Sequence, residues 1–84
     1  MLSERTSIPM NQKQLEIFTT LAQTLNFTKT AEQLFLSQTT VTLQIHALEE
    51  ELQAKLFDRT SRSVRLTYAG SVFLEGAQKI LKMM

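Results

Sequence analysis

The sequence predicts a mainly α-helical domain with a three-helix core, a small β-hairpin and a long C-terminal helix. Apolar residues recur at helical spacing in three segments between residues 12 and 52, and again from residue 68 onward. Between them, residues 56–66 combine polar turn residues with alternating apolar and charged residues, the pattern of a short hairpin. A chain of 84 residues, 43% of them hydrophobic, can bury one modest core, so we expect a single domain.

Composition argues against several classes of protein. The chain has no cysteine, and its one histidine, His46, has no second soft ligand, so disulfides, thiol chemistry and a metal site are not expected. No nucleophile–base pair, carboxylate pair or phosphate-cradling glycine loop can be assembled, so we expect neither an enzyme nor a cofactor. The apolar runs are too short to span a membrane and no signal-peptide pattern is present, which predicts a cytoplasmic protein.

The chain is expected to begin with a flexible leader, residues 1–9, which has no helical period and ends at Pro9. The folded domain is expected over residues 10–66, and its first helix over residues 12–25. Asn11 is a good N-cap for this helix, with Gln14 at the capping-box distance, and Asn26 is expected to end it in the left-handed conformation. The apolar positions of the helix are Leu15, Phe18, Leu21, Ala22 and Leu25.

A short second helix is expected over residues 29–34, with Thr28 as its N-cap. Its inward residues are Ala31 and Leu34. Phe27, which precedes the cap, is expected to be buried.

The third helix is expected over residues 38–52, with Ser37 as its N-cap. At about 100° per residue, its buried stripe consists of Val41, Ile45, Leu48 and Leu52. The opposite arc, at about 100–200° from Val41, consists of Thr39, Thr42, Leu43 and His46. Leu43 in this arc has two interpretations: a scattered surface leucine, or an apolar contact for a thymine methyl group.

Positive charge is concentrated around the hairpin, at residues 55–65. Lys55, Arg59, Arg62 and Arg65 against Asp58 alone give four positive charges minus one, a local +3. Arg59 is expected to bond elsewhere in the fold rather than to a phosphate. The acidic run at residues 49–51 would repel anions, so we expect it to be a solvated face.

The last helix is expected from residue 68 to the end, with Thr67 as its N-cap, within a third segment at residues 67–84. Its apolar residues Ala69, Val72, Phe73, Ile80 and Leu81 are expected on one side.

The second and third helices have the spacing of a helix-turn-helix. Such a unit needs a small residue where its helices cross and apolar residues about ten positions later, which Ala31 and Val41 provide, together with Leu34 and Ile45. The outward residues are small or hydrogen-bonding, as contacts to base edges and phosphates require. On periodicity alone, a three-helix bundle with a merely solvated polar face remains open.

The order of motifs from Asn11 to about Leu81 resembles the LysR-type transcriptional regulators. The matching pieces are Phe27-Thr28 before A-x-x-L, Ser37-Gln38, Gln44-Ile45, Leu48-Glu49, Leu56-Phe57-Asp58-Arg59 and Leu66-Thr67-x-Ala69-Gly70. The resemblance implies a winged helix-turn-helix, followed by a linker helix that pairs with that of a second copy, and sequence-specific binding of double-stranded DNA. The residues then expected at DNA are Thr28, Lys29, Ser37, Gln38, Thr39, Thr42, Leu43, His46 and, in the wing, Arg62.

The chain departs from the family pattern at several positions. Proline is usual where Thr39 stands, serine is common at Thr42, and a basic residue is common at Leu43, so one frequent DNA contact is missing. Glycine usually ends the third helix where Gln53 stands, which predicts a slightly strained turn. Family members also carry a ligand-sensing domain after the linker helix. We therefore expect this chain to be a fragment of a longer regulator and a small-molecule effector to act only through that missing domain.

A homodimer is expected through the last helix, which is too long for the other helices to cover. The residues expected at this contact are Val72, Phe73, Gly76, Ala77, Ile80 and Leu81. The alternative is a helical protein-interaction module that dimerises through the same helix and does not bind DNA. Salt dependence separates the two, because phosphate contacts release counterions.

Overall fold

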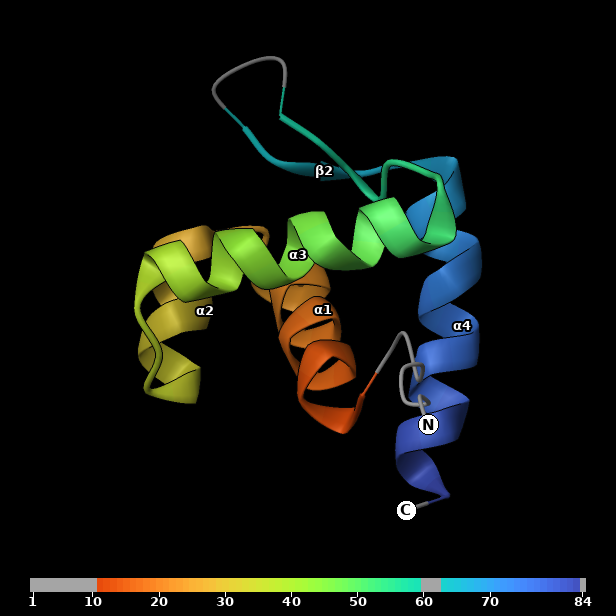
Figure 1. Ribbon diagram of the computed structural model, residues 1–84, viewed down its shortest axis with the longest axis horizontal. Coiled ribbons are helices and arrows are strands. Elements are labelled where there is room, and N and C mark those ends of the chain that lie inside the picture. The colour runs from red at the N-terminus through yellow and green to blue at the C-terminus, as the bar shows by residue number, and fades with distance from the viewer. Residues whose placement is uncertain (1–10, 60–62, 84) are drawn as a thin grey trace, which may run out of the picture.

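The computed structural model describes residues 11–59 and 63–83, and the predicted leader at residues 1–9 lies outside them. Four helices and one two-stranded antiparallel sheet make up this part of the chain (Figure 1). The elements are α1 (Gln12–Thr24), α2 (Phe27–Leu34), α3 (Gln38–Leu52), β1 (Phe57–Asp58), β2 (Arg65–Leu66) and α4 (Tyr68–Lys82). The mainly α-helical class with a small hairpin is confirmed. No described helix is both long and apolar enough to cross a membrane.

Three of the four predicted N-caps are present. Asn11 and Gln14 form the complete capping box at α1, and the side chains of Ser37 and Thr67 accept the backbone N–H three residues on in α3 and α4. The cap of α2 was assigned wrongly. Asn26, not Thr28, caps α2, because its Oδ1 accepts the N–H of Lys29 at 2.8 Å.

Three of the four helices, α1, α2 and α3, end in a left-handed residue that is not glycine. Leu25, rather than the expected Asn26, ends α1 with φ 52°, and Asn26 is extended because its side chain already serves the next helix. Phe35 ends α2 with φ 58° and Gln53 ends α3 with φ 55°. The strained turn predicted at Gln53 is therefore present, and a side chain in this region costs about 1–2 kcal/mol.

One apolar core lies where α1, α3 and α4 meet. Phe18 is at its centre, with its ring centroid 5.5 Å from that of Phe57 and 5.1 Å from that of Phe73. Most of the apolar positions predicted to face inward belong to this cluster, but Leu34 and Leu52 are only half-buried at its edge and Leu25 is 40% exposed. Phe27 is also half-buried rather than buried. The buried members are Leu15, Ile17, Phe18, Leu21, Ala31, Val41, Ile45, Leu48, Leu56, Phe57 and Ala77.

The crossing of α2 and α3 has the predicted composition. Ala31 and Val41 are both buried there. Gln14 of α1 donates from Nε2 to Oε1 of Gln44 on α3 at 2.9 Å, which adds a polar contact between α1 and α3. Figure 1 shows α3 lying across α1 and α2, with the hairpin on the opposite side of α3.

The hairpin packs closely against the start of α4 at Gly70. β1 and β2 pair with Phe57 opposite Leu66. A Cβ at Gly70 would lie 2.3 Å from the backbone O of Leu56 and 2.8 Å from Cδ1 of Leu66, so only glycine fits without a shift. Thr67 stabilises this contact, because its N–H donates to the same Leu56 oxygen at 3.0 Å.

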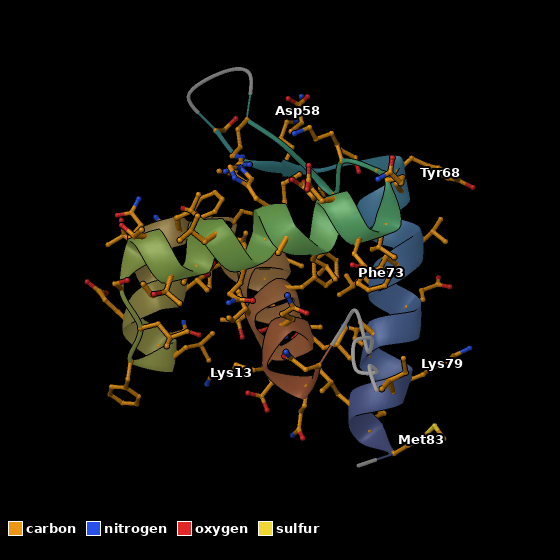
Figure 2. The ribbon with its side chains drawn as sticks, viewed as in Figure 1. Lys13, Asp58, Tyr68, Phe73, Lys79 and Met83 are labelled. Atoms are coloured by element: carbon orange, nitrogen blue, oxygen red, sulfur yellow. The ribbon has the colours of Figure 1, made fainter. Side chains whose placement is uncertain are left out.

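The prediction that Ala69, Val72, Phe73, Ile80 and Leu81 share one side of α4 was wrong for Val72, which is turned away from the core. Ala77 is buried, and Phe73 and Leu81 are half-buried against the core, so these residues hold α4 to its own chain. Val72 lies about 100° from Phe73 around the helix axis and is 55% exposed. Ile80 lies on the same face as Phe73, about two turns later, and is 43% exposed. Figure 2 shows Phe73 directed toward the other helices and Tyr68, Lys79 and Met83 directed away from them.

Candidate nucleic-acid interface

The outward arc of α3 is open to solvent along its length. Gln38, Thr39, Leu43 and His46 are exposed and Thr42 is half-buried, while Val41 and Ile45 on the opposite side are fully buried. The backbone of α3 is thus held by its apolar stripe, and its free side chains include hydroxyl, amide and imidazole groups. These groups can donate to and accept from the base edges of a major groove, which is wide enough to admit a helix.

The start of α2 lies beside the start of α3. The hydroxyl of Thr28 donates to Oε1 of Gln38 at 3.3 Å across the turn, and Lys29 next to it is exposed. A hollow of about 470 Å³ opens here between the starts of the two helices and Ser63 and Val64 of the hairpin. A helix N-terminus with free N–H groups and a lysine favours an anion such as a phosphate.

Ser37 is occupied by its capping role. Its Oγ accepts the N–H of Thr40 at 3.0 Å and donates to the hydroxyl of Thr40 at 2.9 Å. The side chain therefore fixes the start of α3, and a DNA contact by Ser37 remains a prediction.

Arg59 connects the hairpin to α2 and α3, as its expected structural role requires. Its Nη2 donates to Nε2 of His46 at 2.8 Å, and its guanidinium carbon lies 5.0 Å from the ring centroid of Phe27. The same Nη2 lies 4.0 Å from Oε1 of Glu49. Arginine combines these contacts because a planar cation can stack on a ring while it donates in its own plane.

Glu49 was predicted to lie on a solvated face, and this was wrong. Its side chain is only 5% exposed, and its Oε2 accepts the backbone N–H groups of Leu56 and Phe57 at 2.8 and 3.2 Å. Its Oε1 has no hydrogen-bond partner among the described residues, but Lys55 and Arg59 each place a nitrogen 4.0 Å away. Burial is tolerated because two amides and two cations compensate the carboxylate, and residues 50–51 alone are exposed.

The positively charged hairpin is only partly described. Arg62, expected in the wing, lies outside the described residues. Arg65 on β2 is exposed and is paired in register with Asp58 on β1. Among the described residues no group of histidine, cysteine and acidic side chains could hold a metal ion.

Sequence reasoning missed two contributors to this surface, the cap by Asn26 and the contact between Arg59 and His46. The first had a local signal, because Asn26 is three residues before Lys29, the N3 distance of a helix that starts at Phe27. The second had none, because 13 residues and the hairpin geometry separate its two partners.

Comparison with known proteins identifies the family of this chain. The family model for the bacterial regulatory helix-turn-helix protein, lysR family, matches residues 12–71. Among curated relatives, the HTH-type transcriptional regulator CitR of Bacillus subtilis is 49% identical over 72 residues, which cover 86% of this chain and 25% of CitR. A probable RuBisCO transcriptional regulator of Cyanidioschyzon merolae is 44% identical over 78 residues, which cover 93% of this chain and 26% of that protein. This chain thus spans about a quarter of the length of these relatives.

Solved structures agree with this assignment. The CbnR DNA-binding domain, determined in complex with DNA, superposes with a TM-score of 0.84 at 39% identity and covers 88% of this chain and 85% of its own. Vibrio fischeri DarR, also determined in complex with DNA, superposes with a TM-score of 0.85 at 32% identity over 90% of this chain and 26% of its own. The fold is therefore a winged helix-turn-helix, and the chain belongs to the lysR family of bacterial regulatory helix-turn-helix proteins.

Proposed function

We propose that this domain binds double-stranded DNA in a sequence-specific manner, with α3 in the major groove and the hairpin as a wing on the backbone or in the minor groove. The observation that carries the proposal is the open polar arc of α3, which the N-terminus of α2 flanks in a family whose solved relatives include DNA complexes. Gln38, Thr39, Thr42 and His46 are the proposed groove-facing residues. Thr28 and Lys29 are proposed to contact the backbone phosphates.

A salt titration tests DNA binding directly. Binding of a fluorescent duplex is measured by anisotropy. The logarithm of the association constant is expected to fall linearly with the logarithm of the salt concentration, with a slope of about 0.9 for each phosphate contact. Lys29→Ala is expected to lower the slope by about one, because it removes one phosphate contact, and Thr42→Ala is expected to relax base preference instead. Gln78→Ala on α4 is the control variant. Absent binding at low salt would favour the alternative interaction module.

We further propose that two copies dimerise through the outer face of α4, which we define as Val72, Gly76, Ile80 and Met83. Phe73, Ala77 and Leu81 are excluded from this contact because they pack against their own core. A Cβ on Gly76 would meet nothing within 4 Å, so the chain's own packing does not require glycine at a helical position where it is destabilising by about 1 kcal/mol. A glycine at this position would allow the backbone of a second helix to approach closely.

Sedimentation across concentration tests the dimer. Ile80→Lys is expected to shift the domain toward monomer, whereas Gln78→Lys, with the same charge on an exposed position, is expected to leave association unchanged. A two-fold pair would place the two α3 helices roughly 34–36 Å apart, which suits a palindromic site. A domain that is monomeric at every concentration and binds one half-site without cooperativity would contradict this proposal.

A further inference from the structure

The side chain of Arg59 is held on three sides beside the proposed DNA-binding face. Its guanidinium carbon lies over the ring of Phe27, 5.0 Å from the ring centroid. The buried carboxylate of Glu49 is 4.0 Å from Nη2, and Nε2 of His46 accepts from the same nitrogen at 2.8 Å. The side chain is 29% exposed. These contacts fix the direction in which the guanidinium presents its N–H groups.

The hydrogen bond between Arg59 and His46 defines the proton on the imidazole. An arginine has five donors and no acceptor, so Nε2 of His46 must be the acceptor. A neutral imidazole carries one N–H group, and with Nε2 unprotonated that group is Nδ1–H. Among the described residues, no hydrogen-bond partner of Nδ1 is found, and His46 is exposed on the outward arc of α3.

We propose that Arg59 is a positioning residue that holds His46 as a neutral Nδ1–H donor toward the nucleic acid. This deepens the proposed function and rests on it. Without a donor to Nε2, nothing would hold the imidazole in one tautomer or one rotamer. With Arg59 in place, one directional donor is preorganised on α3 for a phosphate oxygen or a base acceptor, and less ordering is needed when DNA binds.

A direct phosphate contact by Arg59 is the competing role. Its three contacts argue against it, because the guanidinium would have to leave Phe27 and the buried Glu49 to reach DNA. That departure would leave the carboxylate of Glu49 with Lys55 as its one nearby cation among the described residues.

The first test reads the tautomer in the free domain, without DNA. The chain has a single histidine, so a long-range ¹H–¹⁵N correlation of the imidazole needs no assignment. At about pH 8, where an ordinary imidazole is neutral, the unmodified domain is expected to show mainly Nδ1–H. This is the opposite of the preference of free histidine in water. Arg59→Leu is expected to restore the Nε2–H form, and Arg59→Lys, which keeps a donor, is expected to retain much of Nδ1–H.

Arg65→Leu is the matched control, because it removes an exposed arginine from the neighbouring strand and leaves the imidazole untouched. An unmodified domain with mainly Nε2–H would overturn the proposal, and this outcome needs no variant to fold. A spectrum that Arg59→Leu does not change would overturn it as well.

The second test is a double-mutant cycle for duplex binding. Arg59→Leu is expected to weaken binding about tenfold when His46 is present, as for one lost donor contact, and to have no effect in a His46→Ala background. The salt slope is expected to stay unchanged, because the donor that is lost belongs to a neutral imidazole and neutralises no phosphate charge. Equal losses in both backgrounds, or a slope lower by about one, would show that Arg59 contacts DNA itself and would overturn the proposal.

The two tests separate this inference from the proposed function. If the unmodified domain fails to bind duplex DNA at low salt, the proposed function fails whatever the tautomer. If it binds DNA but His46→Ala binds equally well, DNA binding stands and the role assigned to Arg59 is refuted.

Discussion

The two glycines of α4 should respond in opposite ways to the same substitution. Gly70 lies in the first turn, where a Cβ would be 2.3 Å from the backbone O of Leu56 and 2.8 Å from Cδ1 of Leu66. That oxygen cannot easily move, because it accepts the N–H of Thr67 at 3.0 Å. Gly76, less than two turns later, has open space on every side. Alanine therefore meets a clash at one position and none at the other.

The expected magnitudes follow from this difference. Gly70→Ala adds an overpacking penalty of about 1–3 kcal/mol, which its helix-propensity gain of up to about 1 kcal/mol only partly offsets. Gly76→Ala has the gain alone. Because the propensity gain is common to both variants, their free energies of unfolding should differ by the overpacking penalty alone, roughly 1–3 kcal/mol. In a domain of this size that separates their melting temperatures by roughly 4–24 °C.

Thermal and urea unfolding by circular dichroism, at a concentration where the domain is monomeric, measures both variants under the same conditions. Low concentration matters because association adds apparent stability. Gly76→Ala should also weaken dimerisation in sedimentation, since the added methyl group keeps two outer faces of α4 apart. Equal stability of the two alanine variants would show that the hairpin does not rest on Gly70 as described.

Substitutions at three further positions test the core, the buried carboxylate and the strained turn. Ile45→Ala should lower the free energy of unfolding by about 2–5 kcal/mol, because the side chain is fully buried, and an unchanged urea midpoint would place α3 wrongly. Glu49→Leu should lower the free energy of unfolding by about 1–3 kcal/mol for each backbone amide that it leaves without an acceptor, those of Leu56 and Phe57. Glu49→Gln, which keeps an acceptor, should lose less, and equal losses would contradict this account. Gln53→Gly should raise the free energy of unfolding by about 0.5–1 kcal/mol, because relief of about 1–2 kcal/mol at a left-handed residue is partly offset by the greater backbone entropy of glycine, and thermal unfolding measures that gain.

Local patterns predicted the elements well, because their signals lie within one helical turn. The capping box of Asn11 and Gln14 and the caps at Ser37 and Thr67 depend on residues three positions apart. The α2 cap was wrong because Asn26 and Thr28 are both good caps two residues apart. The choice between them depends on how early the chain can turn after Leu25, which local propensity does not determine.

Longer-range contacts explain the remaining errors. The apolar residues of α4 cover a wide arc, and periodicity within one helix does not tell which of them meet the core. The contact between Phe18 and Phe73 determines which part of the arc is buried. The acidic run looks uniform along the sequence, yet one member is buried because the turn before β1 brings two backbone amides to Glu49. Which side chains of α3 point outward was easier to predict, since it follows from the angle of each residue about a single helix axis.

Leu43 offers a gain of function that tests the orientation of α3. It is 60% exposed on the outward arc. An exposed leucine with few packing partners can be replaced at a cost within about 0.5 kcal/mol, so the fold should tolerate Leu43→Arg. If α3 lies in the major groove, the new guanidinium reaches a phosphate or a guanine edge.

Leu43→Arg should therefore tighten duplex binding at low salt and steepen the salt slope by about one. Gln78→Arg is the matched control, because it adds the same charge at an exposed position on α4, which Figure 1 shows running away from α3. Net charge alone would strengthen binding by both variants to a similar extent, so only a difference between them supports the placement of α3. If Leu43 instead contacts a thymine methyl group, arginine should also weaken the preference for thymine at one position, measured with duplexes substituted one base pair at a time. Equal affinities and slopes for the two arginine variants would mean that the outward arc of α3 does not face DNA.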